Sequence, residues 1–432
     1  MAKPILVGLL GLGNVGTGVY KILTGNAAGI EQKVGSPVTI KKILVRDVNK
    51  KRSITIAGAE LTSSFEEIIQ DPEISIIVEV LGGESPAKEY IFEALQSGKH
   101  VVTANKDIIA KYGKELFEAA AANQVDLLFE ASVAGGIPII RPLKQCLAAN
   151  RISEIMGIVN GTTNYMLDKM TTEGVDFASV LAEAQAKGYA EADPTADVGG
   201  WDAARKIAIL ASIAFNSRVT LDDVSVEGIT AVTPQDIAYG RELGYVIKLL
   251  AIAQESENGV SVRVHPALIP DSHPLASVRD VFNAIFVRGD AIGEAMFYGR
   301  GAGEMPTASA VCADIIDVAR DIRHNVSSRI LCTCFEEKRI APIAETESSY
   351  YIRLLAEDKP GVMAAIAGAF GAHQVSLESV IQKRKVEQRA EIVLITHRVS
   401  DENLRLATST LKGLSVVNQV SNVIRVVKVG DE

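Results

Sequence analysis

The chain has 432 residues, of which 47% are apolar and 22% charged, so a disordered chain and a disulfide-stapled miniprotein are both excluded. Its 44 basic and 53 acidic side chains give a net charge of −9 without any dense basic tract, which argues against nucleic acid as a partner. Four cysteines are too few for a disulfide framework and indicate a reducing, cytoplasmic location, and no apolar run reaches the ~18 residues of a membrane span.

The first part of the chain, residues 1–133, alternates short β-branched or leucine-rich runs with helical patterns. This rhythm predicts a parallel sheet with crossover helices, which is a Rossmann-type α/β domain. The predicted strands cover residues 5–10, 38–45, 74–80, 100–103 and 125–129, and the predicted helices cover residues 14–23, 65–70, 88–96 and 107–122.

The pattern changes in residues 134–323, where strands and helices are mixed and predict an α+β domain. The predicted strands cover residues 152–159, 224–229, 246–253, 261–268 and 284–287, and the predicted helices include residues 138–149, 201–215 and 307–323. We expect the helix at 305–323 to return and pack on the first domain.

Residues 324–348 contain Pro342 and the start of a polar run, which is typical of a linker. The tail, residues 349–432, then follows the order βαββαβ, which predicts a ferredoxin-like domain. Its predicted strands cover residues 350–356, 375–381, 391–397 and 420–427, and its predicted helices cover residues 361–372 and 402–411.

A glycine fingerprint, Gly11-Leu-Gly13-Asn-Val-Gly16, follows the first predicted strand and opens the first predicted helix. In this context Gly11 permits a tight turn, Gly13 lets the backbone approach a pyrophosphate, and Gly16 allows close helix packing. Unpaired N–H groups at the helix N-terminus would then bind the anion. The motif predicts a dinucleotide site, and a plain tight turn is the alternative interpretation.

The charges at the end of the second predicted strand bear on the choice of dinucleotide. An NAD site usually places an acid there, whereas residues 41–52 hold six basic residues, among them Arg46, and the single acid Asp47. Such a balance suits a ribose 2′-phosphate, so NADP(H) is favoured and NAD(H) remains possible. A solvated surface charge run is the alternative for the lysines of this segment.

Lys106 ends the segment Thr103-Ala-Asn-Lys106 after the fourth predicted strand. The carboxyl edge of a parallel sheet is where open α/β folds bind ligands, so Lys106 is a candidate active-site residue. An ordinary exposed lysine is the alternative.

The densest polar segment covers residues 189–206, where Glu191, Asp193 and Asp197 precede a predicted helix and Asp202 lies four residues before Lys206. One alternative is that Asp193 or Asp197 caps this helix and that Asp202 pairs with Lys206 on the surface. Because the residues after Lys206 are apolar, we instead expect this face to be buried or to line a cleft. A lysine beside carboxylates can move protons there, and the carboxylates can hold a substrate ammonium.

Taken together, these segments make the sequence resemble homoserine dehydrogenase in its longer form, which carries a C-terminal regulatory ACT domain. The resemblance covers essentially the whole chain, and its motifs occur in the family's order. They are the glycine fingerprint, Thr103-Ala-Asn-Lys106, Glu130-Ala-Ser-Val-Ala-Gly-Gly-Ile137-Pro, Asn160-Gly-Thr-Thr-Asn-Tyr165, the block from Glu191 to Lys206, Gly299-Arg-Gly-Ala-Gly303 and, in the tail, Leu355-Ala-Glu-Asp358-Lys-Pro360-Gly361-Val362.

The resemblance implies NAD(P)-dependent interconversion of L-homoserine and L-aspartate 4-semialdehyde, in the route to threonine, methionine and isoleucine. It implies that Lys206 is the catalytic proton donor and Lys106 a second lysine near cofactor and substrate. It implies that residues 134–323 form the domain for substrate binding and dimerisation, with substrate contacts from Glu191, Asp197, Asp202 and Lys106. It implies cofactor contacts from Gly11, Gly13, Asn14, Val15, Gly16, Arg46, Gly82, Thr103, Lys106 and Gly303.

The same resemblance implies a loop that binds a monovalent cation, with Na⁺ as the expected ion, mostly through carbonyl oxygens of Glu130, Val133, Gly135 and Ile137. It implies that L-threonine binds the tail as an effector and that the chain forms a homodimer or homotetramer. Zinc is not expected, because Cys332-x-Cys334 is one residue short of the usual metal-binding spacing.

Two other functions remain open. One is another small amino or hydroxy acid dehydrogenase, such as a semialdehyde dehydrogenase, for which Cys146 is a poor nucleophile candidate. The other is a non-catalytic amino-acid sensor on the same fold, against which the presence of both Lys106 and Lys206 argues. If the chain is the enzyme, we expect these two lysines to converge on one crevice beside the dinucleotide.

Overall fold

The computed structural model describes residues 3–327, 329–330, 332–386 and 389–428. They form two compact units, each assembled from three chain segments. Unit 1 comprises Met1–Ile152, Ala208–Leu221 and Asn283–Glu337, and unit 2 comprises Ser153–Ile207, Asp222–Phe282 and Lys338–Glu432. Within the described ranges, no helix is long and apolar enough to cross a membrane.

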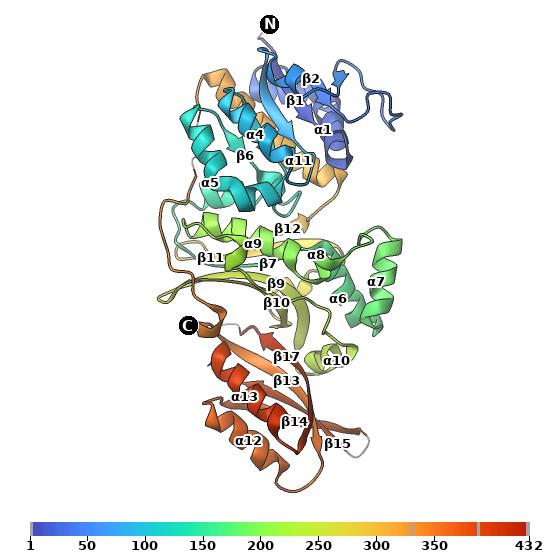
Figure 1. Cartoon of the computed structure of the whole chain (residues 1–432), viewed down its shortest axis with the longest axis vertical. Helices are drawn as coiled ribbons and strands as arrows, with labels where there is room; N and C mark the ends of the chain where they lie inside the picture. The colour runs from blue at the N-terminus through green and yellow to red at the C-terminus, as the bar shows by residue number, and fades with distance from the viewer. Residues whose placement is uncertain (1–2, 328, 331, 387–388, 429–432) are drawn as a thin grey trace. The chain divides into compact units, whose positions relative to one another are not determined.

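Unit 1 is built on a parallel sheet whose strands follow the order β3-β2-β1-β4-β5-β6 (Figure 1). The strands are β1 Ile5–Leu10, β2 Val38–Leu44, β3 Glu60–Thr62, β4 Ile74–Glu79, β5 His100–Thr103 and β6 Leu127–Leu128. The order reverses direction at β1, so the predicted Rossmann-type sheet is confirmed, and ligands of such sheets bind at the carboxyl ends of the strands beside this reversal.

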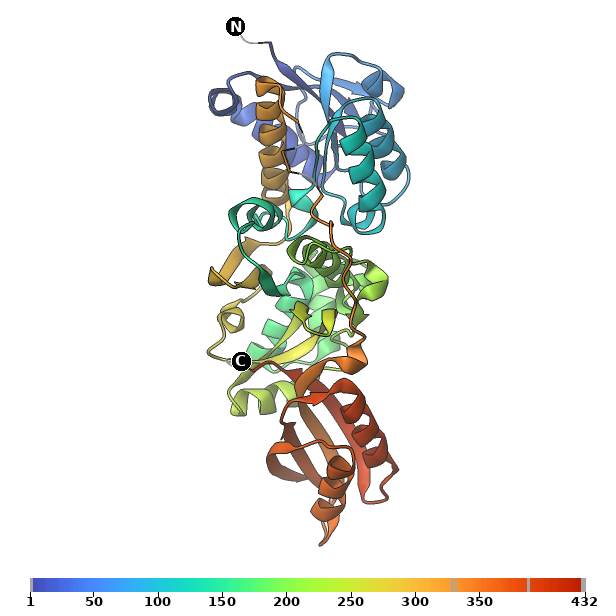
Figure 2. The same ribbon diagram turned by 90° about the vertical axis from the view of Figure 1, so that its left-hand side faces the viewer.

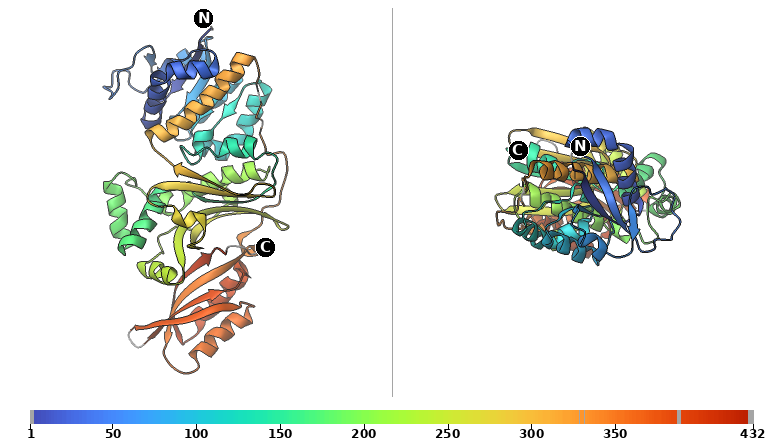
Figure 3. Two further views of the ribbon diagram at one scale, coloured as in Figure 1. Left: turned by 180° about the vertical axis from the view of Figure 1, so that it is seen from behind. Right: turned by 90° about the horizontal axis from the view of Figure 1, so that it is seen from above.

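Helices cover both faces of this sheet, with α1 and α11 on one face and α4 and α5 on the other (Figure 2). The helices of unit 1 are α1 Asn14–Gly25, α2 Ala27–Val34, α3 Glu66–Ile69, α4 Ala87–Gln96, α5 Lys106–Ala122 and α11 Glu304–His324. The helix that was expected to follow the second domain in the chain and pack on the first is α11, which lies along α1 (Figure 3, left). The antiparallel pair β11 Phe282–Gly289 and β12 Gly293–Arg300 leads into it.

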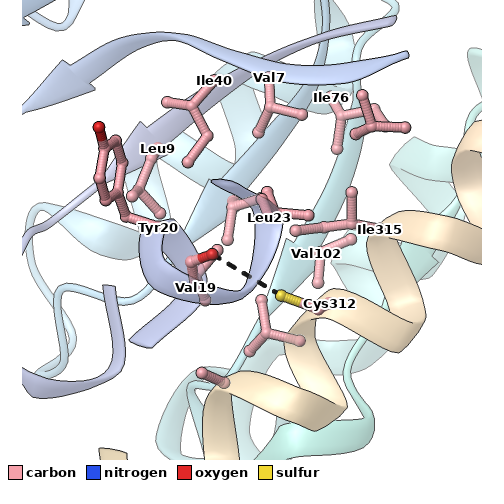
Figure 4. Close-up of a cluster of buried hydrophobic side chains, with 14 of the residues drawn as sticks. Val7, Leu9, Val19, Tyr20, Leu23, Ile40, Ile76, Val102, Cys312 and Ile315 are labelled. Atoms are coloured by element: carbon pink, nitrogen blue, oxygen red, sulfur yellow. Dashed lines mark hydrogen bonds between the residues drawn. The ribbon is translucent and has the colours of Figure 1, made fainter. Parts of the chain in front are cut away.

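The main core of unit 1 lies between the sheet and the pair α1 and α11. Val7 and Leu9 of β1 are completely buried there, together with Val19 of α1 and with Cys312 and Ile315 of α11 (Figure 4). The Cys312 thiol lies 3.9 Å from the carbonyl oxygen of Val19, which is 293 residues earlier in the chain. This face of the sheet is therefore buried by segments from both ends of the unit.

The sequence predicted a regular helix over residues 138–149, and this prediction was wrong in type and length. The structure has a short π-helix, η2 Pro142–Cys146, in which the N–H of Leu147 reaches the carbonyl oxygen of Pro142. Pro142 has no N–H to donate, and the N–H groups of residues 139–141 donate instead to the carboxylate of Glu130 at 2.6 to 2.8 Å. The carboxylate of Glu130, which lies outside the helix, thus accepts the backbone hydrogen bonds at the point where the predicted helix would begin.

The first part of unit 2 confirms the mixed sheet. β7 Ile152–Ile158 pairs antiparallel with β9 Tyr245–Ser256, and β9 pairs antiparallel with β10 Gly259–Pro270. The strand predicted over 224–229 is only β8 Ser225–Val226. The remaining elements are α6 Gly161–Glu173, α7 Phe177–Ala186, α8 Thr195–Val198, α9 Trp201–Ala214, which continues into unit 1, η3 Leu221–Asp223, α10 Pro234–Glu242 and η4 Pro274–Ser277.

The tail confirms the ferredoxin-like prediction, because its strands run antiparallel in the order β17-β13-β15-β14. Its elements are η5 Ile343–Glu345, β13 Glu347–Glu357, α12 Val362–Ala372, β14 Leu377–Val386, β15 Arg389–Thr396, β16 Val399–Ser400, α13 Asp401–Gly413 and β17 Val417–Val426. Alternate residues of β13, such as Ile352 and Leu354, form the core under α12 and α13. β17 also pairs with β10, so the tail sheet continues the mixed sheet.

A buried ionic cluster fastens the other face of the tail sheet to α10. Arg353 of β13 donates from Nε to Asp236 of α10 at 2.7 Å and from a terminal nitrogen to Glu391 of β15 at 3.2 Å. Glu391 also accepts a 2.6 Å hydrogen bond from the hydroxyl of Tyr239, and Asp236 accepts a 2.8 Å bond from Asn422. Both carboxylates are thus satisfied, and loss of one partner would leave a buried charge unpaired.

The close approach of α1 and α11 can be tested by a substitution at Gly18. A Cβ atom on Gly18 would lie 2.7 Å from both the Cβ of Ala308 and the carbonyl oxygen of Glu304, whereas a Cβ on Gly25 of the same helix would meet nothing within 4 Å. We expect Gly18→Ala to destabilise unit 1 by roughly 1–3 kcal/mol. Gly25→Ala should leave stability unchanged or raise it slightly, because Ala favours helix. Differential scanning calorimetry of the two variants measures this, and equal transition temperatures would contradict the packing argument.

Candidate functional site

The glycine fingerprint forms the turn between β1 and α1. Gly11 has φ +105°, a conformation that L side chains rarely adopt, and a Cβ on Gly16 would lie 2.1 Å from the carbonyl oxygen of Gly11. Gly13 is the N-cap of α1, and a Cβ there would point into open space. Two of the glycines are therefore required by the turn itself, while Gly13 leaves room beside the backbone.

The N-terminus of α1 fits the pyrophosphate of a dinucleotide. Among the described residues, no side chain caps this helix, and no acid stands in its first turn, which includes Asn14 and Val15. The N–H groups of that turn and the positive end of the helix dipole therefore face the space beside Gly13. This arrangement supports the dinucleotide prediction better than a plain tight turn does.

The basic segment after β2 separates into structural and exposed charges. Lys41 forms ion pairs with Asp71 and Glu73, each at 2.7 Å, so the surface alternative holds for Lys41. Arg46 is exposed at the strand tip, and one carboxylate oxygen of Asp47 accepts a 2.8 Å bond from the N–H of Asn49. The acid that could hold a ribose hydroxyl is thus partly engaged in its own turn, while the Arg46 guanidinium points to solvent.

Glu79, which the sequence analysis missed, organises the tips of β4 and β5. This buried carboxylate accepts a 2.6 Å bond from the hydroxyl of Thr103 and a 2.8 Å bond from the N–H of Leu81. Burial raises its pKa, and these hydrogen bonds oppose the shift. Gly82, three residues after Glu79, has φ +75°. The sequence signal that could have revealed Glu79 is an acidic residue at the end of the apolar run that forms β4.

Lys106 is the first residue of α5, directly after the N-cap Asn105. The side chain of Asn105 accepts a bond from the N–H of Ile108 at 3.3 Å and donates to the carbonyl oxygen of Gly83 at 2.7 Å. Lys106 is half-buried, and its charge lies at the positive end of a helix dipole, where a cation is disfavoured by roughly 0.3–1 kcal/mol. Helix stability therefore does not account for a lysine at this position.

The loop predicted to bind a cation runs through η1 Glu130–Ser132 to Ile137, and Val133, Gly135 and Ile137 are all buried. The carboxylate of Glu130 is already occupied by the three N–H groups of residues 139–141. Over the described ranges, no cluster of three His, Cys, Asp or Glu side chains could hold a metal. The remaining donors are backbone carbonyl oxygens, which suit a hard monovalent cation and not zinc.

This loop packs tightly on the glycine loop before α11. Gly135 has φ +51°, and a Cβ on it would lie 2.4 Å from the carbonyl oxygen of Gly301. Gly303, with φ +128°, is the N-cap of α11. Asp314 of α11 also holds this loop, because its carboxylate accepts a 2.8 Å hydrogen bond from the N–H of Glu130. The predicted cofactor residue Gly303 and the predicted cation loop are thus neighbours in unit 1.

In unit 2, Asn160 joins the polar block that the sequence singled out. Its side-chain oxygen caps α6 by accepting a 2.9 Å bond from the N–H of Thr163. Its side-chain nitrogen donates to Asp197 at 2.7 Å and to Asp202 at 2.9 Å. Asn160 is therefore the N-cap of α6, and the same side chain also fixes two carboxylates from α8 and α9.

Lys206 lies in the same cluster. Its Nζ donates to Asp202 at 2.6 Å and to the carbonyl oxygen of Val159 at 2.7 Å. The side chains of Lys206 and Asp202 are only 12% and 14% exposed, so the surface-pair alternative is wrong. Asp193 accepts a 3.1 Å bond from the N–H of Thr195 and so serves the short helix α8, not α9.

The charges of this cluster favour a cationic ligand group. Burial raises the pKa of Asp197, and the negative charges of Asp202 and Glu191 raise it further, whereas the bond from Asn160 and the charge of Lys206 lower it. Glu191 is exposed. Three carboxylates thus act on one region that holds one ammonium, and an added cation would relieve their mutual repulsion.

Lys248 is a second buried lysine that the sequence analysis missed. It lies in the middle of β9, is 1% exposed, and donates to the side-chain oxygen of Asn164 at 3.0 Å and to the carbonyl oxygen of Val278 at 2.6 Å. Burial lowers its pKa to about 8. The signal that could have found it is a single lysine inside the apolar run Tyr245-Val-Ile-Lys-Leu-Leu-Ala-Ile-Ala.

Comparison with known proteins identifies all three parts of the chain. Residues 138–316 match the homoserine dehydrogenase family, residues 11–130 match the NAD-binding domain of homoserine dehydrogenase, and residues 350–416 match the ACT domain. The chain is 45% identical over 426 residues to homoserine dehydrogenase of Bacillus subtilis, with 98% of each chain covered. It is 47% identical over 431 residues to homoserine dehydrogenase of Synechocystis sp., with 98% of this chain and 99% of the relative covered.

Solved structures agree with these sequence matches. A homoserine dehydrogenase from Thiobacillus denitrificans superposes with a TM-score of 0.94 at 42% identity, with 99% of both chains covered. A hyperthermophilic archaeal homoserine dehydrogenase mutant in complex with NADPH superposes with a TM-score of 0.62 at 27% identity, covering 73% of this chain and 98% of that chain.

The buried Lys248 predicts a pH dependence of stability. Its pKa falls from 10.5 in the unfolded chain to about 8 in the folded chain, so between these values the folded chain binds fewer protons. The contribution of Lys248 to the free energy of unfolding should therefore rise from pH 8 towards pH 10.5. We expect Lys248→Met to remove this slope in urea denaturation. Lys412→Met, at an exposed position of α13, should keep it, and equal slopes in both variants would contradict the assignment.

Proposed function

Because this chain belongs to the homoserine dehydrogenase family, we propose that it catalyses the NAD(P)-dependent interconversion of L-aspartate 4-semialdehyde and L-homoserine. The observation that carries the proposal is the cluster of Asn160, Asp197, Asp202 and Lys206, which puts a fixed ammonium among carboxylates within the segment that matches the family.

For the cofactor, we propose NADP(H) in preference to NAD(H). The exposed Arg46 guanidinium at the tip of β2 supports this choice because it can pair with a ribose 2′-phosphate, and Asp47 is partly engaged by Asn49. One solved relative is described as a complex with NADPH. The proposed dinucleotide contacts are those of the glycine turn, Arg46, Gly82, Thr103, Lys106 and Gly303.

The proposed chemistry adds a hydride to the aldehyde carbon and a proton to the aldehyde oxygen. When bound, the nicotinamide supplies the hydride or accepts it in the reverse direction. Negative charge develops on the oxygen, and the ammonium of Lys206 stabilises that charge and donates the proton. In the oxidising direction, neutral Lys206 takes the hydroxyl proton, directly or through water. The bonds to Asp202 and Val159 support this role because they hold Nζ in one position.

The substrate's other end is a cationic amino group beside a carboxylate. We propose that Glu191, Asp197 and Asp202 organise the pocket and hold the ammonium, which their mutual repulsion favours. Lys106 is proposed as the second lysine acting on substrate and cofactor, which would give its position at the start of α5 a function that helix stability does not provide. The carbonyl oxygens of Glu130, Val133, Gly135 and Ile137 are proposed to hold Na⁺.

We further propose that the ACT domain binds L-threonine and that the chain assembles as a homodimer or homotetramer. The proposed effector turn runs from Asp358 to Gly361, between β13 and α12. Gly361 has φ +88° and caps α12, while Asp358 pairs with Lys385 of β14 at 2.5 Å. The left-handed backbone at Gly361 and the charged pair of Asp358 and Lys385 support this placement, because a small amino acid offers charged groups of both signs.

Activity and the role of Lys206 are tested together. Wild-type protein mixed with homoserine and NADP⁺ should produce the absorbance of reduced nicotinamide, more weakly with NAD⁺. Lys206→Met should lower kcat by roughly 10²–10⁴-fold, the range for loss of a general acid or base, with NADPH affinity nearly unchanged in a fluorescence titration.

Lys187→Met is the matched control, because Lys187 also pairs with an acid one helical turn away, Glu183 at 2.7 Å, but is 48% exposed. Its kcat should stay near that of the wild type. Equal loss of turnover and NADPH affinity in Lys206→Met would assign that lysine a structural role, and no reaction of the wild type with homoserine would refute the function.

The effector proposal is tested by titrating the full chain with L-threonine in a calorimeter and in the activity assay. We expect heat of binding and inhibition, and we expect Gly361→Ala to weaken both because a side chain is strained at φ +88°. Gly368→Ala in the same helix α12 meets nothing within 4 Å and should bind as the wild type does. Absence of both heat and inhibition in the wild type would rule out threonine as the effector.

A further inference from the structure

A cavity of about 410 Å³ opens in unit 1 beside α5, and nothing in the proposed reaction uses it. Apolar side chains of α5 and β6, including Phe117 and Leu127, form part of its wall, and Cys332 and Cys334 line it from the segment after α11. Its charged lining residues are Lys114, Glu118, Asp126, Arg218, Glu336 and Glu337. The cavity is large enough to admit a small polar molecule to both thiols.

The two thiols lie two residues apart in the chain and line the same cavity. Cys334 and Cys332 interact through their side chains, and the N–H of Phe335 returns to the carbonyl oxygen of Thr333 at 3.0 Å, which bends the chain around Cys334. Cys334 also lies 3.7 Å from the carbonyl oxygen of Ser212, which fixes its side chain. The pair is therefore held together by local chain geometry.

The surroundings make the two thiols chemically unequal. The hydrogen bond from Cys334 first, and then the charges of Lys144 and Arg218, lower the pKa of Cys332 to about 6 against the opposing effect of burial. The pKa of Cys334 is raised by the same hydrogen bond and by burial. Lys144 and Arg218 line the smaller pocket that both cysteines share with α9. These surroundings favour the thiolate form of Cys332 over that of Cys334.

We propose that the sulfur of Cys332 acts as a nucleophile towards a hydroperoxide that enters this cavity, and that Cys334 resolves the product to a Cys332–Cys334 disulfide. In the first step the sulfur of Cys332 attacks the terminal peroxide oxygen and the O–O bond breaks. Hydrogen peroxide releases hydroxide, which takes a proton to become water, and an organic hydroperoxide releases an alkoxide, which takes a proton to become an alcohol. The product is a sulfenic acid on Cys332.

In the second step the thiol of Cys334 loses its proton, and its sulfur attacks the sulfenic sulfur. The S–O bond breaks, and the hydroxyl leaves with that proton as water. The two thiols are oxidised and the peroxide is reduced, so the electrons balance. A metal ion is a poorer occupant, since Lys144 and Arg218 bring positive charge to the thiols. This inference does not rest on the proposed dehydrogenase activity.

The test treats the full-length protein with hydrogen peroxide at neutral pH and follows it by intact mass and peptide mapping. The wild type should lose two hydrogen atoms, with the disulfide mapped to Cys332 and Cys334. Cys334→Ser should instead accumulate a sulfenic acid on Cys332 that dimedone traps. Cys332→Ser should form neither product. Cys146→Ser is the control, because Cys146 is the exposed cysteine and its loss should change nothing.

A second measurement keeps the proposal testable if a cysteine variant fails to fold. The rate of Cys332 alkylation by iodoacetamide should reach half its maximum near pH 6 in the native protein, whereas in the unfolded chain it should do so at about pH 8.5. Arg218→Gln should move the native profile to higher pH. Preferential oxidation of Cys146, or a native profile identical to the unfolded one, would overturn the proposal.

Discussion

The return of α11 to the sheet of unit 1 is the constraint on which the rest of this unit depends. One face of the parallel sheet is apolar, and α1 and α2 alone do not bury it; Cys312 and Ile315 of α11 complete the core. The contact is close because Gly18 has no side chain to hold the helices apart. The packing of α11 on the sheet also positions Gly303, the N-cap of α11, and Asp314, which accepts a hydrogen bond from the loop of Glu130. The same helix therefore completes the core and positions both candidate ligand loops.

Buried polar side chains, each with its partners satisfied, set the geometry of both candidate sites. Glu79 joins two strand tips in unit 1, and Asn160 joins α6 to the carboxylates of α8 and α9 in unit 2. Leaving one of these buried polar groups without its partner would destabilise the fold by roughly 1–3 kcal/mol for each lost hydrogen bond. The side chains therefore have little conformational freedom. Rigidity of this kind is what the proton transfer proposed for Lys206 would require.

The tail sheet is attached to the mixed domain by charge as well as by strand pairing. Arg353 lies between Asp236 and Glu391, and β17 extends the edge of β10. Since a buried charge without its partner is costly, these ion pairs favour one arrangement of the tail sheet against α10. The thiol cavity of unit 1 is a separate feature, and its chemistry depends on the cations near Cys332 and not on either ligand site.

The sequence by itself determined the fold classes and the chemical segments. Strand and helix periodicities predicted the parallel sheet, the mixed sheet and the βαββαβ tail, because burial imposes those periods locally. Only the tertiary structure decided that residues 138–149 form a π-helix, that Asp193 serves α8, and that Lys41 is structural while Arg46 is exposed. It also revealed Glu79 and Lys248. The contacts of Lys41, Glu79 and Lys248 join residues 24 to 84 positions apart in the chain, and local pattern carries no information about such contacts.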